Sequence, residues 1–161
     1  MNTAKSKPII RYVIIAISLL IAFLLWNNHI FAGASPTNIG INNGKLTTCP
    51  GTPNCVNSQA PITDKEHEIA PLLLSGDISS AMTNLKQVVR SMPRTNIVKE
   101  TNNYLHVEFA SKLMGFVDDV EFYIDNDGKM IQVRSASRLG ESDLGVNRQR
   151  IEEIRTLLGA V

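Results

Sequence analysis

Four arginines surround two glycines and a Ser-Asp pair in the stretch RSASRLGESDLGVNRQR, residues 134 to 150. Arginine forks bind phosphate, sulfate and carboxylate groups, and glycine loops and helix N-termini offer free backbone amides to the same anions. The spacing therefore predicts a binding site for an anionic small molecule or a lipid headgroup. The candidate ligand-binding residues are Arg134, Arg138, Gly140, Ser142, Asp143, Asn147 and Arg148.

An internal network of ion pairs is the alternative interpretation of the same arginines. Arg148 and Arg150 fall in the first turns of a predicted helix, where the helix dipole disfavours cations, so a negative group must compensate them. This helix has Ser142 or Asp143 as its N-cap. The carboxylates that could pair with the arginines are Asp118, Asp119, Glu121, Glu141 and Asp143. Rigid loops that hold such pairs are also where binding sites are built, so both interpretations stay open.

Catalysis on the polar side of the predicted sheet is a weaker hypothesis. His106 and Glu108 share that side with Asp119, and a hydrolase would use such groups as acid and base. Alternation sends Asp118 and Asp119 to opposite faces, which works against a shared dyad. The sequence contains no GxSxG, HExxH or phosphate-loop pattern, and we assign no catalytic residue, metal ligand or cofactor.

The two cysteines lie at the ends of the short stretch CPGTPNC, Cys49 to Cys55. Its prolines and glycine favour tight turns that bring the two ends together. Two thiols are too few for a metal site, so we predict a disulfide, which an oxidising compartment would favour. A ring this small would stabilise the fold by about 2 kcal/mol.

The hydrophobic periodicity predicts two amphipathic helices and four strands. Helical spacing extends over residues 75–93, with Asp77 as the N-cap, and over residues 141–161. The predicted strands are near residues 95–101, 104–111, 116–124 and 130–138. We therefore predict an α+β fold, a four-stranded antiparallel sheet with two amphipathic helices on one face.

Turn residues set the pairing of the strands and thereby the two faces of the sheet. If Asp127 and Gly128 form a two-residue hairpin loop, Arg134 lies directly across from Glu121, with Asp119 diagonal to it. The polar face would carry Lys99, His106, Glu108, Asp119, Glu121, Gln132, Arg134 and Arg138. The core face would carry Val98, Leu105, Val107, Phe109, Val120, Phe122, Ile131 and Val133.

A nearly unbroken apolar run, Ile9 to Trp26, precedes the domain. Its length predicts an N-terminal transmembrane helix or, in the alternative interpretation, a signal peptide cleaved after Ala34. Lys5, Lys7 and Arg11 place the N-terminus in the cytoplasm and the rest outside. We therefore expect a single-pass protein of the cell membrane with an extracytoplasmic domain, or a secreted or periplasmic domain after cleavage.

The chain divides into three predicted parts. These are a cytoplasmic tip with the anchor or signal peptide at residues 1–31, a linker at 32–48 and a domain at 49–161. The lipid bilayer is accordingly a predicted partner. Three of the 16 Lys and Arg residues precede Ser35, so 13 remain against 15 Asp and Glu, a net charge of −2. No basic field recruits nucleic acid, and we expect no nucleic-acid partner.

Three blocks of sequence resemble the domain-of-unknown-function family numbered 1499: CPGTPNCVNSQ, GFVDDVEF and RSASRLGESDLGVNRQRIE. The resemblance covers residues 49 to 158 and implies no reaction, because that family is defined by its sequence pattern. Members commonly carry a membrane segment or signal before the domain. The positions that the resemblance marks are Cys49, Asn54, Cys55, Ser58, Asp118, Asp119, Arg134, Ser137, Arg138, Gly140, Ser142, Asp143, Gly145, Asn147 and Arg148.

These observations predict a binding domain rather than an enzyme. The domain is expected to be anchored to the membrane and to bind an anionic ligand. An accessory subunit of a membrane-protein complex is the alternative, with SKLMGF, residues 111–116, as an apolar contact tip. Leu113, Met114 and Phe116 would make that contact unless they pack beneath a helix.

Overall fold

The computed structural model describes residues 6–26, 31–125 and 130–160. Its helices are α1 (Ser6–Trp26), α2 (Ile78–Ser91) and α3 (Val146–Leu158). Its strands are β1 (Ile41–Asn42), β2 (Lys45–Leu46), β3 (Cys55–Asn57), β4 (Leu72–Leu73), β5 (Thr95–Glu100), β6 (Tyr104–Ala110), β7 (Val117–Ile124) and β8 (Met130–Ser137). The two amphipathic helices and the four long strands lie where the periodicity predicts them.

The main sheet has six antiparallel strands, and the predicted four-stranded sheet is therefore wrong. Its order is β3-β8-β7-β6-β5, and β4 also pairs with β8. The two additional strands share the outer edge of β8: Cys55 pairs with Ala136 near one end, and Leu72 pairs with Ile131 near the other. A strand of two or three residues is too short to show alternation, which is why periodicity did not find β3 and β4. A separate two-stranded sheet joins β1 and β2.

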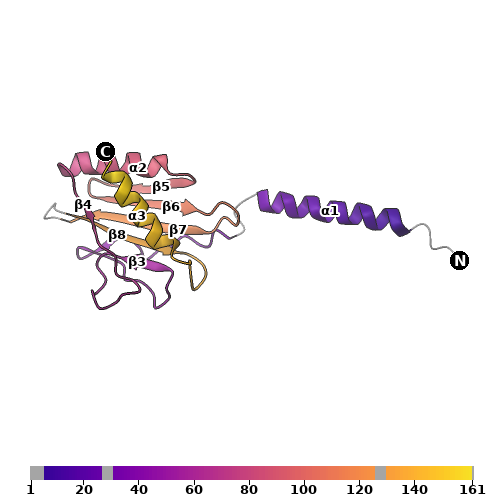
Figure 1. Cartoon of the computed structure of the whole chain (residues 1–161), viewed down its shortest axis with the longest axis horizontal. Helices are drawn as coiled ribbons and strands as arrows, with labels where there is room; N and C mark the ends of the chain where they lie inside the picture. The colour runs from indigo at the N-terminus through magenta and orange to yellow at the C-terminus, as the bar shows by residue number, and fades with distance from the viewer. Residues whose placement is uncertain (1–5, 27–30, 126–129, 161) are drawn as a thin grey trace.

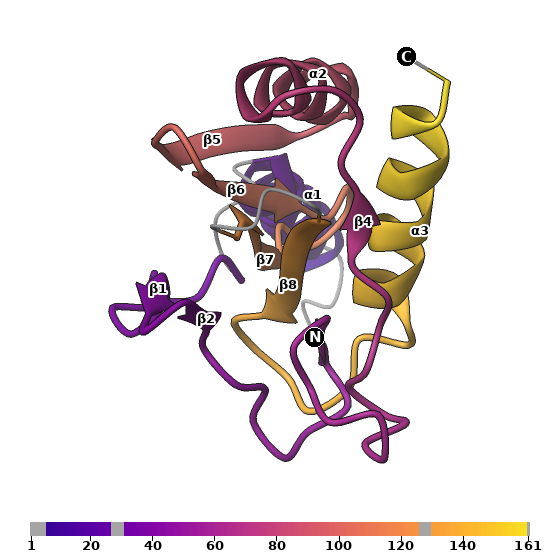
Figure 2. The same ribbon diagram turned by 90° about the vertical axis from the view of Figure 1, so that its left-hand side faces the viewer.

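The apolar core lies between the sheet and the helices α2 and α3. Figures 1 and 2 show α3 crossing one side of the main sheet, with α2 beside β5. Leu85 of α2 and Ile151 of α3 share this core with Phe122 of β7, and all three side chains are fully buried. Asp77 caps α2 as predicted, because its carboxylate accepts a hydrogen bond from the amide of Ser80 at 2.8 Å.

The predicted register of the central strands is confirmed. Arg134 pairs with Glu121 and Val133 pairs with Phe122. The hairpin residues Asp127 and Gly128 lie outside the described residues. The predicted faces hold except in β5, where a register shift between Ile97 and Lys99 turns Ile97 to the core and leaves Val98 half exposed.

Helix α1 extends away from the sheet domain (Figure 1), and its side chains from residue 8 to residue 23 are exposed. Among the described residues, however, the structure contains no helix with the length and apolar character that a membrane crossing requires. This finding goes against the predicted transmembrane helix and the predicted single-pass location, and both predictions are wrong. The division of the chain at residues 31 and 48 stays a prediction.

The chain before β3 packs over the polar face of the sheet. Figure 2 shows the β1–β2 hairpin on the opposite side of the sheet from α3. The amide of Gly40 donates a hydrogen bond to Glu121 at 2.7 Å, and Leu46 forms a small apolar cluster with Tyr104 and Tyr123. The predicted disulfide is present between Cys49 and β3. This covering explains why the charged residues beneath it are buried.

Candidate functional site

The structure separates the four arginines of the predicted anion site. Arg134 and Arg138 lie on the polar face of the sheet. Arg150, on α3, instead contacts Asp118 on the opposite face, which the helices cover. Arg148 contacts the loop before β4, through a hydrogen bond from its Nη2 to the carbonyl oxygen of Glu66 at 3.0 Å. No common point for a ligand therefore joins the four guanidinium groups.

Glu121 is the centre of one buried cluster on the polar face. One carboxylate oxygen accepts hydrogen bonds from the Tyr104 hydroxyl at 2.8 Å and from the Gly40 amide at 2.7 Å. The other oxygen accepts from Arg134 Nη1 at 3.2 Å, and the Glu121 side chain is 0% exposed. The pKa of Tyr104 is raised, first by burial and then by the negative charge of Glu121. Arg134 Nε is buried without a partner among the described residues.

Asp119 and Arg138 form a second buried cluster beside the first. Arg138 donates to the Asp119 carboxylate from Nε at 2.7 Å and from Nη2 at 2.8 Å, and it also binds Glu108. His106 Nε2 lies 2.8 Å from the same Asp119 carboxylate. Burial raises the pKa of Asp119, but the hydrogen bonds from Arg138 and His106 outweigh it and hold that pKa below its usual range. The carboxylates of Asp119 and Glu108 thus both bind the guanidinium of Arg138.

The pair of His106 and Asp119 has the components of an acid–base site. An imidazole oriented by a carboxylate can act as a general base. Only 7% of His106 is exposed, however, and within the described chain no hydroxyl or thiol binds its ring. In the same described residues, no group of three or more His, Cys, Asp or Glu side chains could hold a metal ion. Asp118 lies on the other face, so it does not join Asp119 in a dyad.

On the helix face, Asn147 connects α3 to the strands. Its side-chain amide donates to the carbonyl oxygen of Asn54 and to the Ser137 hydroxyl, both at 3.0 Å. Its carbonyl oxygen accepts from Ser135 at 2.5 Å and from Arg150 at 2.7 Å. Asn147 is 0% exposed, and all these bonds are internal. It therefore positions α3 on the sheet.

Arg150 completes this helix-face cluster. Its Nη2 lies 2.5 Å from the Asp118 carboxylate, and its guanidinium stands over the Phe109 ring at 4.8 Å from the ring centroid. The positive charge of Arg150 is thus balanced by a carboxylate and by an aromatic face. The internal-network interpretation describes Arg134, Arg138 and Arg150 in this structure.

The start of α3 already holds a carboxylate of the chain itself. Asp143 accepts hydrogen bonds from the amide of Gly145 at 2.9 Å and from the amide of Asn147 at 2.7 Å. The N-cap of α3 is Gly145, which adopts φ of +83°, and the predicted N-cap at Ser142 or Asp143 is wrong. Gly140 has φ of +85°, and its carbonyl oxygen accepts from Asn54 at 2.6 Å, while the Ser142 hydroxyl accepts from the Leu144 amide at 3.3 Å. An anion entering here would compete with Asp143.

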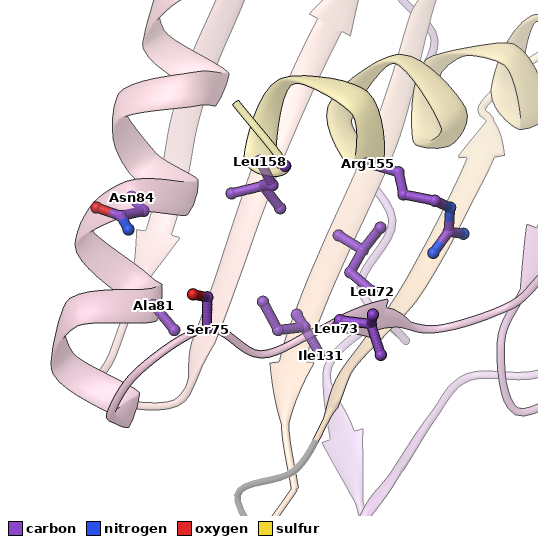
Figure 3. A pocket seen from close by; sticks show the side chains of 9 residues that line it. Leu72, Leu73, Ser75, Ala81, Asn84, Ile131, Arg155 and Leu158 are labelled. Atoms are coloured by element: carbon purple, nitrogen blue, oxygen red, sulfur yellow. The ribbon is translucent and has the colours of Figure 1, made fainter. Parts of the chain in front are cut away.

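A pocket of about 290 Å³ lies on the other end of α3, between α2, α3 and β4 (Figure 3). Apolar side chains form most of its lining: Leu72, Leu73, Ala81, Ile131 and Leu158. Three polar side chains complete it, Ser75, Asn84 and Arg155, together with Gly159. Figure 3 shows Asn84 on α2 and Arg155 on α3 at opposite sides of the pocket.

The polar groups of this pocket differ in how they are bound. Arg155 donates to the carbonyl oxygens of Pro71 and Ala70 at 2.6 and 2.7 Å and forms an ion pair with Glu152 at 2.9 Å. Among the described residues, no side-chain hydrogen bond joins the half-buried Asn84 amide or the exposed Ser75 hydroxyl to another group of the protein. Both are therefore available to a bound molecule.

Sequence reasoning did not find this pocket. Its lining comes from four separate segments, and β4 is a two-residue strand inside the short apolar run PLLL. The one available signal was the pattern of α2, where Asn84 and Ala81 are one turn apart on a helix edge. Nothing in the sequence indicates that α3 ends above the same spot.

The loop between β6 and β7 exposes the apolar residues of the predicted contact tip. Leu113 is 79% exposed, and Met114 and Phe116 are partly exposed. The ring of Phe116 stacks on Phe31 with 5.1 Å between the ring centroids. These side chains do not pack beneath a helix, but what they contact in an assembly stays a prediction.

Comparison with known proteins identifies the family of this chain. Residues 45–158 match the model of a family described as "Protein of unknown function (DUF1499)", and the chain belongs to that family. The match confirms the resemblance in the three sequence blocks and covers the chain from β2 to α3, which includes the whole six-stranded sheet. No curated protein matches the chain.

Proposed function

We propose that this member of the family of unknown function numbered 1499 is a binding protein that takes a small molecule into the pocket between α2, α3 and β4. The observation that carries the proposal is a mostly apolar lining that also presents two uncharged polar side chains, the exposed Ser75 and the half-buried Asn84. Small-molecule sites are typically concave, mostly apolar and equipped with a few polar groups that orient the ligand.

Binding is better supported than catalysis. The described lining of the pocket has one hydroxyl, that of Ser75, and no His, Asp, Glu or Lys side chain that could activate it as a nucleophile. The His106–Asp119 pair lies on the opposite face of the sheet beneath the covering segment. A hydrolase using the polar face stays a prediction with less support, because its groups are engaged with one another and buried.

The anion site predicted at residues 134–150 also has less support than the pocket. Three of its arginines bind carboxylates, and Asp143 occupies the amides at the start of α3. Arg148 differs from the others, because it binds only the carbonyl oxygen of Glu66 among the described residues. Anion binding at this corner and partner binding through residues 111–116 therefore remain predictions.

An NMR titration of the full chain with 1-hexanol tests the proposal. A molecule of seven non-hydrogen atoms in such a pocket should bind with a dissociation constant of about 1 mM. Each CH₂ group added from 1-butanol to 1-hexanol should tighten binding about fourfold, the equivalent of about 0.8 kcal/mol. Shifts should concentrate at the ends of α2 and α3 and at β4.

A pair of variants on α2 locates the binding. Asn84→Phe places a ring in the pocket and should weaken 1-hexanol binding at least tenfold. Gln87→Phe is the matched control, because Gln87 is exposed on the same helix and does not line the pocket. Equal binding by both variants and the parent chain would count against the proposed site.

A further inference from the structure

The pocket between α2, α3 and β4 has a single charged side chain among its described lining residues, Arg155. Its Nη1 and Nη2 donate to the carbonyl oxygens of Pro71 and Ala70, at 2.6 and 2.7 Å. Its Nε lies 2.9 Å from the carboxylate of Glu152, one turn earlier on α3. The guanidinium thus connects α3 to the chain that leads into β4.

This arrangement removes Arg155 as a partner for a charged ligand. Its donors are directed to backbone carbonyls and to Glu152, and the Glu152 carboxylate balances its positive charge. Arg155 is a positioning residue that holds one wall of the pocket in place. The rest of the lining is uncharged.

An ion in this pocket would lose hydration without gaining a counter-charge. Such a transfer is costly for either sign of charge. The cost is greater for an anion, because α3 ends at Leu158 and Gly159 beside the pocket, and a helix C-terminus carries partial negative charge. An uncharged hydrogen-bonding group, in contrast, meets the Asn84 amide and the Ser75 hydroxyl.

We infer that the pocket selects uncharged molecules with an apolar body and a terminal hydrogen-bonding group, and that it rejects carboxylates of the same length. The inference rests on the proposed function, because it names the class of ligand for the same site. Selection arises from the pairing of Arg155 with Glu152 rather than from the size of the pocket.

Three probes with the same six-carbon chain test this selectivity at neutral pH: 1-hexanol, hexylammonium and hexanoate. The full chain should bind 1-hexanol at least tenfold more tightly than hexanoate, with hexylammonium between them. Equal or tighter binding of hexanoate at the pocket would overturn the inference while leaving the proposed function intact. Failure of all three to bind would overturn the proposed function and the inference with it.

A charge variant tests the physical cause. Glu152→Gln leaves the Arg155 charge uncompensated, so hexanoate should bind at least threefold more tightly than it does to the parent chain. Binding of 1-hexanol should stay within twofold of the parent value. Glu153→Gln is the matched control, because Glu153 is the next residue on α3 and does not line this pocket. An unchanged hexanoate affinity in Glu152→Gln, or the same gain in both variants, would overturn the inference.

Discussion

At Glu121, the strand register determines the pairing with Arg134, whereas the segment that packs over the sheet determines the burial. Alternation along the strands was sufficient to predict that Glu121 lies across from Arg134, and the register confirms it. Alternation could not predict that the Gly40 amide and the Tyr104 hydroxyl also donate hydrogen bonds to the Glu121 carboxylate. That requires knowing where the preceding segment packs, which no local period encodes.

Replacing Glu121 by leucine should destabilise the fold by about 3–5 kcal/mol, because it leaves the Arg134 charge buried without a partner. The double variant Glu121→Leu with Arg134→Met should recover much of that loss, since it removes both charges. Urea denaturation measures both effects. Glu153→Leu, an exposed change, should stay within about 0.5 kcal/mol. A loss below about 1 kcal/mol in Glu121→Leu would contradict the account of this cluster.

His67 is a buried residue whose role sequence reasoning missed. Its Nδ1 lies 2.9 Å from both carboxylate oxygens of Asp64, and its Nε2 lies 3.1 Å from the carbonyl oxygen of Thr52 in the disulfide ring. Both neighbours are acceptors, so the protonated ring, which donates from both nitrogens, satisfies them best. Burial lowers the pKa of His67, but these hydrogen bonds outweigh it, and the pKa is raised above its ordinary value.

A raised pKa in the folded state makes the contribution of His67 depend on pH. The stabilisation is fully present below the unfolded-state value of 6.5 and is lost as the pH rises through the higher folded-state value. His67→Gln should therefore lower the unfolding temperature more at pH 5.5 than at pH 8.5. Asp64→Asn should remove most of this pH dependence. A larger effect of His67→Gln at pH 8.5 would show that the ring is not the donor to both neighbours.

At the scale of elements, the sequence predicts the long helices and strands but not the short strands. Helices α2 and α3 and strands β5 to β8 have enough turns or alternations for a period to appear. Strands β3 and β4 have three and two residues, and they form because β8 offers an unpaired edge rather than because of their own sequence. The sequence also showed that arginines cluster at residues 134–150. It did not show that the fold divides these arginines between the two faces of the sheet.

Asn147 is the contact that attaches α3 to β3 and β8. Asn147→Leu keeps the size of the side chain but removes four hydrogen bonds. The Ser137 hydroxyl loses its partner, whereas the Ser135 hydroxyl keeps Arg150 Nη1 and the Asn54 carbonyl oxygen keeps the Ser137 amide. The expected loss of unfolding free energy is about 3 kcal/mol. Chemical denaturation with a helix-sensitive signal measures it.

Gln149→Leu provides the control on the same helix. Gln149 is exposed, and its replacement should change the unfolding free energy by less than about 0.5 kcal/mol. Similar losses in the two variants would indicate that α3 is held by its apolar side chains alone and not by the Asn147 hydrogen bonds.

On the scale of the whole molecule, the two sides of the sheet have different roles. The polar side is closed by the segment around β1 and β2 and holds paired charges, whereas the helix side ends in an open pocket between α2, α3 and β4 (Figures 2 and 3). The sequence alone indicated the charged side, because arginines and carboxylates are conspicuous there. It could not indicate the pocket, because four separate segments form the lining and none of them is unusual in composition.

The most direct test of the central claim is to locate a bound small molecule by NMR. Intermolecular nuclear Overhauser effects between 1-hexanol and the methyl groups of the full chain report contacts within about 5 Å. We predict such effects at Leu72, Ile131 and Leu158, which line the pocket. Effects confined to Leu113 and Met114 at the exposed tip, or no effects at the pocket methyl groups while 1-hexanol is bound, would contradict it.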